Sequence, residues 1–269
     1  MNSVLFEFGW FSIKWYSVFI LLAMLMGSFI FYQEIKKKDL PKDDMENIIF
    51  YVLLFGILGA RIYYVLFNLD YYLQNPIEII EIWHGGLAIH GGIIAGLITL
   101  LVYCKYCKKK KINTILLIDT IVMGLLLAQA IGRWGNFFNG EAYGRTVSYE
   151  FLRNLHLPSF IIKGMYIDGA YREPTFLYES VFSLIGFFIL FGISRLKKIK
   201  VGQLTGLYLI WYGIERIIIE SFRSDSLMLG PMKMAQIISL IFIVFGIYLM
   251  IKNIKNNKYY KEERLLLEK

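Results

Sequence analysis

Several ionisable side chains occur inside segments of this sequence that are otherwise apolar. Charged groups are costly in hydrocarbon, so they usually face the interior of a helix bundle or a wet cavity and mark functional sites. The residues concerned are Arg61, His90, Asp119, Arg133, Glu215, Arg216, Glu220 and Arg223. Arginine suits a phosphate, because its planar guanidinium is always charged and donates hydrogen bonds in a fork. These residue types therefore predict an anion-binding site within a membrane.

The segments that carry these residues are long enough to cross a membrane, which takes about 20 mostly apolar residues. The 269-residue chain is 57% apolar and 17% aromatic, more apolar surface than a soluble domain of this size carries. We expect helices at 15–33, 47–67, 86–103, 114–134, 176–194, 203–221 and 233–251. The predicted fold is an all-α integral membrane protein with seven transmembrane helices in one polytopic domain, 1–269.

Lysine and arginine in the connections orient these helices, because cytoplasmic loops retain positive charge. Basic residues follow the first, third, fifth and seventh helices, whereas the connection 68–83 has none. We therefore expect the N-terminus outside and the C-terminus in the cytoplasm. The net charge of +8 lies in these clusters, which argues against a nucleic-acid-binding face. No cleavable signal peptide is expected, since the first apolar run is too long and no A-x-A site follows it.

The connection at about 136–175, between the fourth and fifth helices, is long and lies outside in this topology. It contains charges of both signs, aromatic residues and glycines. Connections of this length are usually functional or form a small subdomain, and a disordered linker is the alternative. The aromatic content favours folding, so we predict a small extracytoplasmic subdomain at 136–175.

The polar residues share a depth in the predicted membrane. Those in its outer half are Tyr16, Arg61, His90, Arg133, Arg216, Glu220 and Arg223. Asp119 alone lies near the inner side. Four residues of the sixth helix share one face through spacings of four, four and three: Tyr212, Arg216, Glu220 and Arg223. The residues by themselves thus indicate that an anionic lipid or organic anion binds from the outer side.

Structural interpretations remain open for each of these residues. Arg216 and Glu220, or Glu220 and Arg223, could form ion pairs that hold the bundle together. Tyr16 could be an interfacial anchor, and His90 could pack between closely approaching helices because glycines flank it. The arginine near the end of the fourth helix could extend to the headgroups. None of these interpretations explains the shared depth.

No metal or cofactor site is predicted. Cys104 and Cys107 form a single C-x-x-C pair without a second pair or a nearby histidine, so they cannot complete a tetrahedral zinc site. The histidines at 84, 90 and 156 do not have the spacing of metal ligands.

The run GRWGNFFNGEAYG at 132–144 closely resembles the signature of the prolipoprotein diacylglyceryl transferase family. Further ordered blocks resemble the same family. They lie at 14–16, 59–61, 84–92, 173–179, 212–216 and 220–223. The resemblance covers nearly the whole chain, and the seven-helix, N-out architecture that it implies agrees with the topology predicted above.

The resemblance implies an enzyme of the bacterial plasma membrane. It would transfer the diacylglyceryl group of phosphatidylglycerol to the thiol of the lipobox cysteine of a preprolipoprotein, forming a thioether and releasing glycerol phosphate. Its partners would be this lipid and the lipobox segment, and no cofactor is implied. The reaction needs a thiolate as nucleophile and neutralisation of charge on the departing phosphate.

Residue roles follow from the matching motifs. The resemblance implies that Arg133 and Arg216 bind the lipid phosphate and stabilise the leaving group, and that Tyr16 and Tyr212 position the headgroup. The charged residues at the same depth that we assign to the same lipid site are Arg61, Glu220 and Arg223.

The remaining roles concern pocket shape and proton transfer. Asn136, Asn139 and Glu141 would shape the pocket from the signature. His90 is the candidate general base, since the usual pKa of histidine, about 6.5, suits proton uptake at neutral pH. Glu141, or a thiolate stabilised by arginine, is the alternative to His90.

Two other classes of protein are compatible with buried charges. A transporter or flippase for an anionic lipid or metabolite would need polar groups toward both membrane faces, and Asp119 is the only inner candidate. A membrane scaffold would show an exposed interaction surface and no pocket, and the spacing of the buried charges argues against it.

Overall fold

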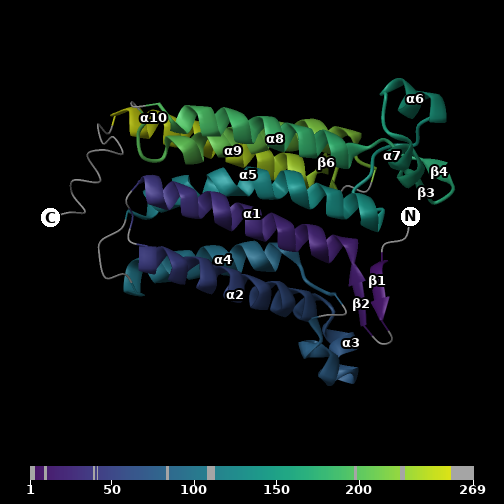
Figure 1. The fold of residues 1–269 in the computed structure, drawn as a ribbon, viewed down its shortest axis with the longest axis horizontal. Coiled ribbons are helices and arrows are strands. Elements are labelled where there is room, and N and C mark those ends of the chain that lie inside the picture. Colours follow the sequence, from purple (N-terminus) through teal and green to yellow (C-terminus); the bar gives the residue numbers. More distant parts are fainter. Residues whose placement is uncertain are drawn as a thin grey trace. The chain divides into compact units, whose positions relative to one another are not determined.

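The computed structural model describes residues 4–8, 11–38, 40, 42–82, 85–107, 113–196, 199–224 and 228–255 (Figure 1). A long helix forms at each of the seven predicted ranges. These helices are α1 (Trp15–Lys37), α2 (Lys42–Phe67), α4 (Ile89–Val102), α5 (Thr114–Asn139), α8 (Thr175–Ser194), α9 (Gln203–Phe222) and α10 (Met234–Lys255). His84, the lysines at 108–111 and 197–198, and the predicted tail beyond 255 lie outside the described residues.

Membrane-spanning character is clear for most of these helices. Within the described chain, six are long and apolar enough to cross a membrane: α1, α2, α4, α5, α8 and α10. The 20-residue α9 carries Glu215, Arg216 and Glu220, and these charges make it less apolar than the others. The protein is therefore a helical, multi-pass membrane protein, while the seventh span and the orientation stay predictions.

The contacts divide the chain into two units. One contains most of α1 together with α5 to α10, and the other contains α2 to α4. In the first unit, α9 lies beside both α8 and α10 (Figure 1). The core of this unit joins Val122 and Leu126 of α5 to Leu190 of α8 and Leu204 of α9.

Small residues let α1 approach α5 in the first unit. A Cβ atom built on Gly124 would lie 2.5 Å from the carbonyl oxygen of Gly27. Close contact through glycine is the usual way in which helices pack inside a membrane, where lipid removes the hydrophobic drive for association. This contact fixes α1 against the helix that carries the signature motif.

Asp119 caps another helix. Its carboxylate is fully buried and accepts hydrogen bonds from the backbone N–H groups of Gly202 and Thr205, at 2.5 and 2.7 Å, and from the Thr205 hydroxyl. The first N–H groups of a helix have no partner within the helix, and a carboxylate there also interacts favourably with the helix dipole. Asp119 of α5 thus holds the beginning of α9.

The segment between α5 and α8 is folded. It contains α6 (Tyr149–Asn154), α7 (Ser159–Gly164), β3 (Tyr166–Ile167) and β4 (Ala170–Tyr171). Leu152, Ile161 and Met165 of this segment form a buried cluster with Phe137 of α5 and Phe176 of α8. We call residues 140–174 the head segment. This buried cluster excludes the linker alternative, whereas the prediction that the segment is an extracytoplasmic subdomain is not tested.

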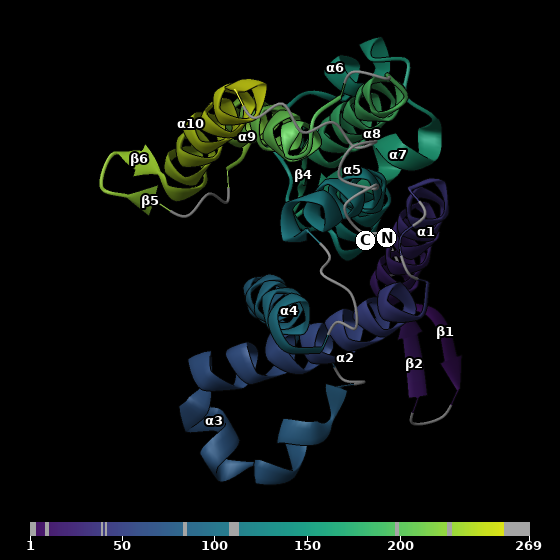
Figure 2. The ribbon, with the colours of Figure 1, turned by 90° about the vertical axis from the view of Figure 1, so that its left-hand side faces the viewer.

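The second unit pairs α2 with α4 (Figure 2). The helix α3 (Leu69–Gln74) and the short 3₁₀ helix η1 (Pro76–Ile80) follow α2, and a π-helical turn, η3 (Tyr103–Cys107), follows α4. Gly59 makes the pairing possible, because a Cβ atom there would lie 2.2 Å from the Ala95 Cβ.

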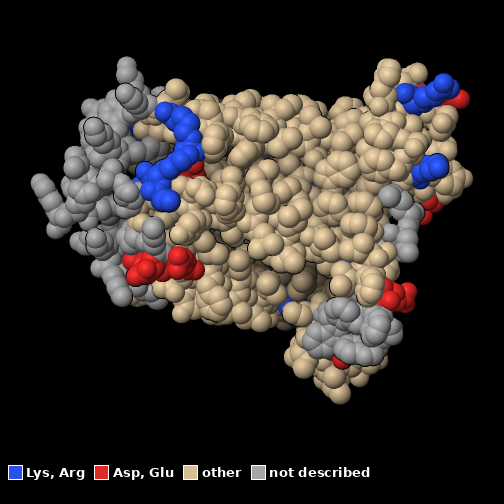
Figure 3. Space-filling view, viewed as in Figure 1, with Lys and Arg blue, Asp and Glu red and all other residues tan. Residues whose placement is uncertain are grey.

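Two short hairpins outside the helices were not predicted. β1 (Val4–Phe8) pairs with β2 (Phe11–Lys14), and β5 (Met228–Leu229) pairs with β6 (Met232–Lys233), each in antiparallel orientation. β2 alternates apolar and polar residues over its four positions and so carried a usable signal, whereas β5 and β6 have only two residues each. On the face shown in Figure 3, Lys, Arg, Asp and Glu side chains gather at the two ends of the first unit, and hardly any of them lies on the surface between those ends.

Candidate active site

Two arginines from different helices meet on one carboxylate. Arg133 of α5 lies with its Nε 2.8 Å from Oε2 of Glu179, and Arg216 of α9 lies with its Nη1 2.6 Å from Oε1 of the same residue. Glu179 belongs to α8 and is 1% exposed. The structure therefore brings together the two guanidinium groups that the sequence analysis assigned to one site.

These three residues lie at the same level of the first unit because α8 runs opposite to α5 and α9. Arg133 and Arg216 each lie six residues before the end of their helix, at Asn139 and Phe222, which is about 9 Å of helix. Glu179 lies four residues after the start of α8 at Thr175, about 6 Å of helix. The shared depth therefore holds for this pair, at the helix ends that adjoin the head segment.

Two further buried carboxylates line the same part of α9. Oε2 of Glu220 lies 2.9 Å from Nη2 of Arg216, so the ion pair considered as a structural alternative is present. Glu215 accepts a hydrogen bond on Oε1 from the Ser183 hydroxyl at 2.8 Å. The arginines thus lie among acidic groups, and any anion that binds them must share them with these carboxylates.

The asparagines and Glu141 of the signature lie around the C-terminal end of α5. Nη1 of Arg133 donates to Oδ1 of Asn136 at 3.4 Å, and Nδ2 of Asn139 donates to Oε1 of Glu141 at 3.3 Å. Glu141 is exposed, and its backbone N–H donates to the Asn136 carbonyl at 3.0 Å. The motif therefore presents a carboxylate and two amides on the side of the arginine pair that faces the head segment.

Tyr16 and Tyr212 approach the site from different helices. A Cβ atom on Gly135 would lie 3.1 Å from the Tyr16 ring, so Tyr16 packs against the helix that carries Arg133. Tyr212 lies one turn before Arg216 and stacks on Tyr208, with 6.0 Å between ring centroids. The Tyr208 hydroxyl accepts a hydrogen bond from Gln129 Nε2 at 3.1 Å. Both predicted tyrosines belong to the unit that holds the arginine pair.

The backbone at Arg223 joins the end of α9 to the signature. Arg223 forms an isolated antiparallel bridge with Gly144, and the N–H of Gly144 donates to the Glu173 carbonyl at 2.9 Å. A Cβ atom on Gly144 would lie 2.8 Å from the Glu173 Cβ, so a larger residue would push these segments apart. Close packing thus explains why the last residue of the motif is a glycine.

His90 is the second residue of α4 and is exposed. Its ring centroid lies 6.2 Å from that of Tyr63. His90 belongs to the unit of α2 to α4, whereas Arg133 and Arg216 belong to the other unit. Its role as general base stays a prediction.

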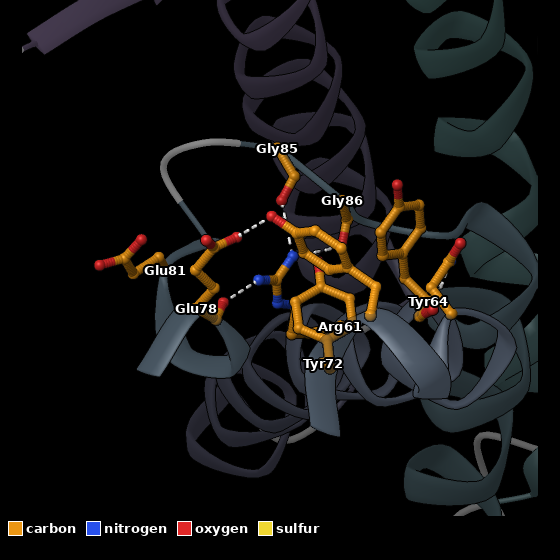
Figure 4. A pocket seen from close by; sticks show the side chains of 9 residues that line it. Arg61, Tyr64, Tyr72, Glu78, Glu81, Gly85 and Gly86 are labelled. Carbon is orange, nitrogen blue, oxygen red and sulfur yellow. Dashed lines mark hydrogen bonds between the residues drawn. The ribbon is translucent and has the colours of Figure 1, made fainter. Parts of the chain in front are cut away.

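Arg61 makes a different set of contacts from the other arginines. It donates to the carbonyls of Ile79, Gly85 and Gly86 at 2.8–2.9 Å and also to that of Glu78. Its guanidinium lies 5.2 Å from the centroid of the Tyr72 ring, beside a cavity of about 420 Å³ (Figure 4). Four of its five N–H groups are therefore used by these backbone carbonyls, and its assignment to the lipid phosphate stays a prediction.

Glu179 is the residue that the sequence analysis missed. It lies inside the predicted helix 176–194, where an ionisable residue is costly. A carboxylate at that depth opposite two arginines of other spans was a usable signal. The sequence does not show which neighbour it contacts, because that depends on how three helices are rotated about their axes.

Known proteins resemble the chain over most of its length. The family model for prolipoprotein diacylglyceryl transferase matches residues 3–252. A phosphatidylglycerol–prolipoprotein diacylglyceryl transferase of Staphylococcus haemolyticus is 48% identical over 93% of this chain and 88% of that protein. Proteins of the same name from Staphylococcus saprophyticus and Staphylococcus xylosus are each 47% identical, over 93% and 96% of this chain and 89% and 91% of their own lengths. The chain belongs to the prolipoprotein diacylglyceryl transferase family.

Proposed function

We propose that this protein transfers the diacylglyceryl group of phosphatidylglycerol to the thiol of the lipobox cysteine in preprolipoproteins. The thiolate attacks the glyceryl carbon, the bond from that carbon to the phosphate oxygen breaks, and glycerol phosphate leaves with the electron pair. The relatives are named for this activity, and this chain matches them over 88–91% of their own lengths. The observation that carries the proposal is the meeting of Arg133 and Arg216 on Glu179.

Arg133 and Arg216 bind the lipid phosphate and stabilise the charge that develops on the leaving group. Two fixed guanidinium groups can donate to different oxygens of one phosphate, and donors that are already in place need no reorganisation during the reaction. Glu220 holds Arg216, and Asn136 lies beside Arg133. Tyr16, Tyr212, Asn139, Arg61 and Arg223 complete the proposed lipid site.

The thiol proton passes to His90 or to Glu141. His90 is exposed at the start of α4, where it can meet a peptide. Glu141 is exposed at the end of the signature. Both are therefore accessible to a substrate thiol.

The enzyme works in the bacterial plasma membrane, with seven spans, the N-terminus outside and the head segment on the outer surface. The basic residues at the ends of α1 and α8, Lys36, Lys37 and Arg195, support this orientation. Substrate lipid then enters the arginine pair from the outer leaflet. Asp119, the inner candidate of a transporter pathway, instead caps α9.

The decisive experiment reconstitutes the purified protein in nanodiscs that contain phosphatidylglycerol and adds a synthetic lipobox peptide. We expect a mass gain of one diacylglyceryl group on the cysteine and release of glycerol phosphate. A peptide with serine in place of cysteine, and nanodiscs of phosphatidylethanolamine alone, are the matched controls. If no product forms and the protein carries anions across proteoliposome membranes, the transporter is the correct function and the transferase is not.

A further inference from the structure

The Glu179 carboxylate has one oxygen on each arginine. Oε2 lies 2.8 Å from Arg133 Nε and Oε1 lies 2.6 Å from Arg216 Nη1. The two oxygens of a carboxylate have a fixed separation, so a single buried side chain sets how far apart the two guanidinium groups lie. α5 and α9 contribute the arginines, and α8 contributes the spacer between them.

Each arginine keeps an edge that Glu179 does not use. The Arg133 and Arg216 side chains are 23% and 17% exposed, whereas that of Glu179 is 2% exposed. Among the described residues, the contacts leave Nη2 of Arg133 and Nε of Arg216 without a protein acceptor. An anion can therefore reach the open edges of both guanidinium groups while Glu179 holds them from the buried side.

The arginines in this cluster already face negative charges. Glu179 and Glu220 form ion pairs with Arg133 and Arg216, and Glu215 is a third buried carboxylate on α9. The phosphate of the lipid carries one negative charge, and the departing glycerol phosphate carries more, because a phosphate monoester ionises a second time near pH 6. An uncompensated arginine pair would hold this product more tightly than the substrate.

We propose that Glu179 is a positioning residue that fixes the spacing of Arg133 and Arg216 and offsets their charge, so that the pair stabilises the departing phosphate and then releases it. This inference rests on the proposed function and assigns to that site a control over product release. Glu179 itself need not touch the substrate, because it acts through the two guanidinium groups.

A purely structural ion pair is the competing explanation, since buried pairs also hold helices together and are destabilising when broken. The two explanations differ in what happens to anion affinity. Loss of a purely structural ion pair lowers the amount of folded protein and weakens the binding of every ligand. Loss of the Glu179 charge strengthens the binding of an anion to the arginines that remain.

The test is Glu179→Gln in nanodiscs, with kcat and KM for phosphatidylglycerol and the inhibition constant of added glycerol phosphate. Glutamine keeps the length of the side chain but has no negative charge, and its amide NH₂ cannot accept a hydrogen bond from the arginine that it faces. We expect kcat to fall roughly 10- to 100-fold. This is less than the roughly 10²- to 10³-fold loss that follows removal of a donor to a developing anion, because both arginines remain and only their placement is disturbed. We expect glycerol phosphate to inhibit about tenfold more tightly, as the removal of a nearby negative charge predicts.

Two further variants make the result specific. Glu179→Asp keeps the charge but is too short to reach both arginines, so kcat should fall while inhibition by glycerol phosphate stays as in the wild type. Glu173→Gln is the matched control, because Glu173 is also buried and pairs with a single arginine, Arg145, at 3.0 Å. Its inhibition constant should not change.

Each outcome separates this inference from the proposed function. A wild-type protein that makes no product overturns the proposed function, and the inference with it. If the wild type is active and glycerol phosphate inhibits Glu179→Gln no more tightly than it inhibits the wild type, the inference alone is overturned. If Glu179→Gln does not fold, Glu179→Asp decides: tighter inhibition by glycerol phosphate, or an unchanged kcat, overturns the inference.

Discussion

The two ends of the first helical unit each contain buried carboxylates, and they use them differently. At one end, Asp119 accepts hydrogen bonds from two backbone N–H groups and a hydroxyl at the start of α9. At the other end, Glu179 and Glu220 bind the guanidinium groups of Arg133 and Arg216. Asp119 accepts hydrogen bonds from backbone N–H groups, whereas Glu179 and Glu220 hold the side chains of two arginines in place.

The difference lies in what remains available to a ligand. The Asp119 side chain is fully buried and the partners named here belong to the fold, so this carboxylate holds no exposed charge that a ligand could share. The arginines at the other end are partly exposed and keep unused N–H groups. A buried charge alone therefore does not identify a site. What distinguishes Glu179 is that one buried carboxylate contacts two partly exposed arginines from different helices.

The largest expected effect comes from removing either arginine. Arg133→Ala and Arg216→Ala should each reduce diacylglyceryl transfer by roughly 10³-fold, because each removes a charged donor from the departing phosphate. Mass spectrometry of the lipobox peptide measures the product. Arg145→Ala, which removes an arginine with a 66% exposed side chain from the head segment, is the control and should retain activity. Normal turnover by both site variants would refute the leaving-group role and the comparison with it.

The next effect identifies the proton acceptor. The variant that removes the general base, His90→Asn or Glu141→Gln, should lower kcat by about 10²-fold or more. The other should retain most of the activity. Peptide titration in the single-turnover regime separates this step from lipid binding. Equal and small losses in both variants would favour a thiolate stabilised by arginine.

A smaller effect is expected at Glu220. Glu220→Gln removes one of the two ion pairs of Arg216 and leaves Arg216 bound to Glu179, so turnover should fall only about tenfold, less than for removal of a donor to the leaving group. The measurement is kcat in nanodiscs beside Glu179→Gln. If kcat falls further in Glu220→Gln than in Glu179→Gln, Glu220 is the main positioning residue.

The smallest effect on turnover is expected at the opposite end. Asp119→Asn should weaken the cap of α9 and lower stability by about 1–3 kcal/mol, since hydrogen bonds to charged groups contribute on this order. Thermal unfolding in detergent should report a lower Tm, while activity per folded molecule stays within about twofold. A variant that keeps its Tm but loses turnover would show that the capped end takes part in the reaction.

Sequence alone identified the long helices, because the thickness of hydrocarbon demands runs of apolar residues that few other structures need. It also placed Arg133 and Arg216 at one depth, since helical rise and alternating direction convert residue number into height. The signature and the ordered blocks gave the family, which the comparisons confirm. The hairpin of β5 with β6 was not predictable from strands of two residues, and the short alternating run of β2 was a signal that the prediction did not use.

Rotation of the helices was decided only by the tertiary structure. Residue spacing gives the height of a side chain along a helix, but the neighbour it faces depends on packing at contacts such as Gly27 with Gly124. The role of Glu179 between two arginines, the hold of Arg61 on loop carbonyls, and the cap that Asp119 provides for α9 all depend on such neighbours. Sequence determined that Arg133 and Arg216 lie at one level of their helices, whereas three-dimensional packing decided which charged groups are bound by the fold and which keep N–H groups for a ligand.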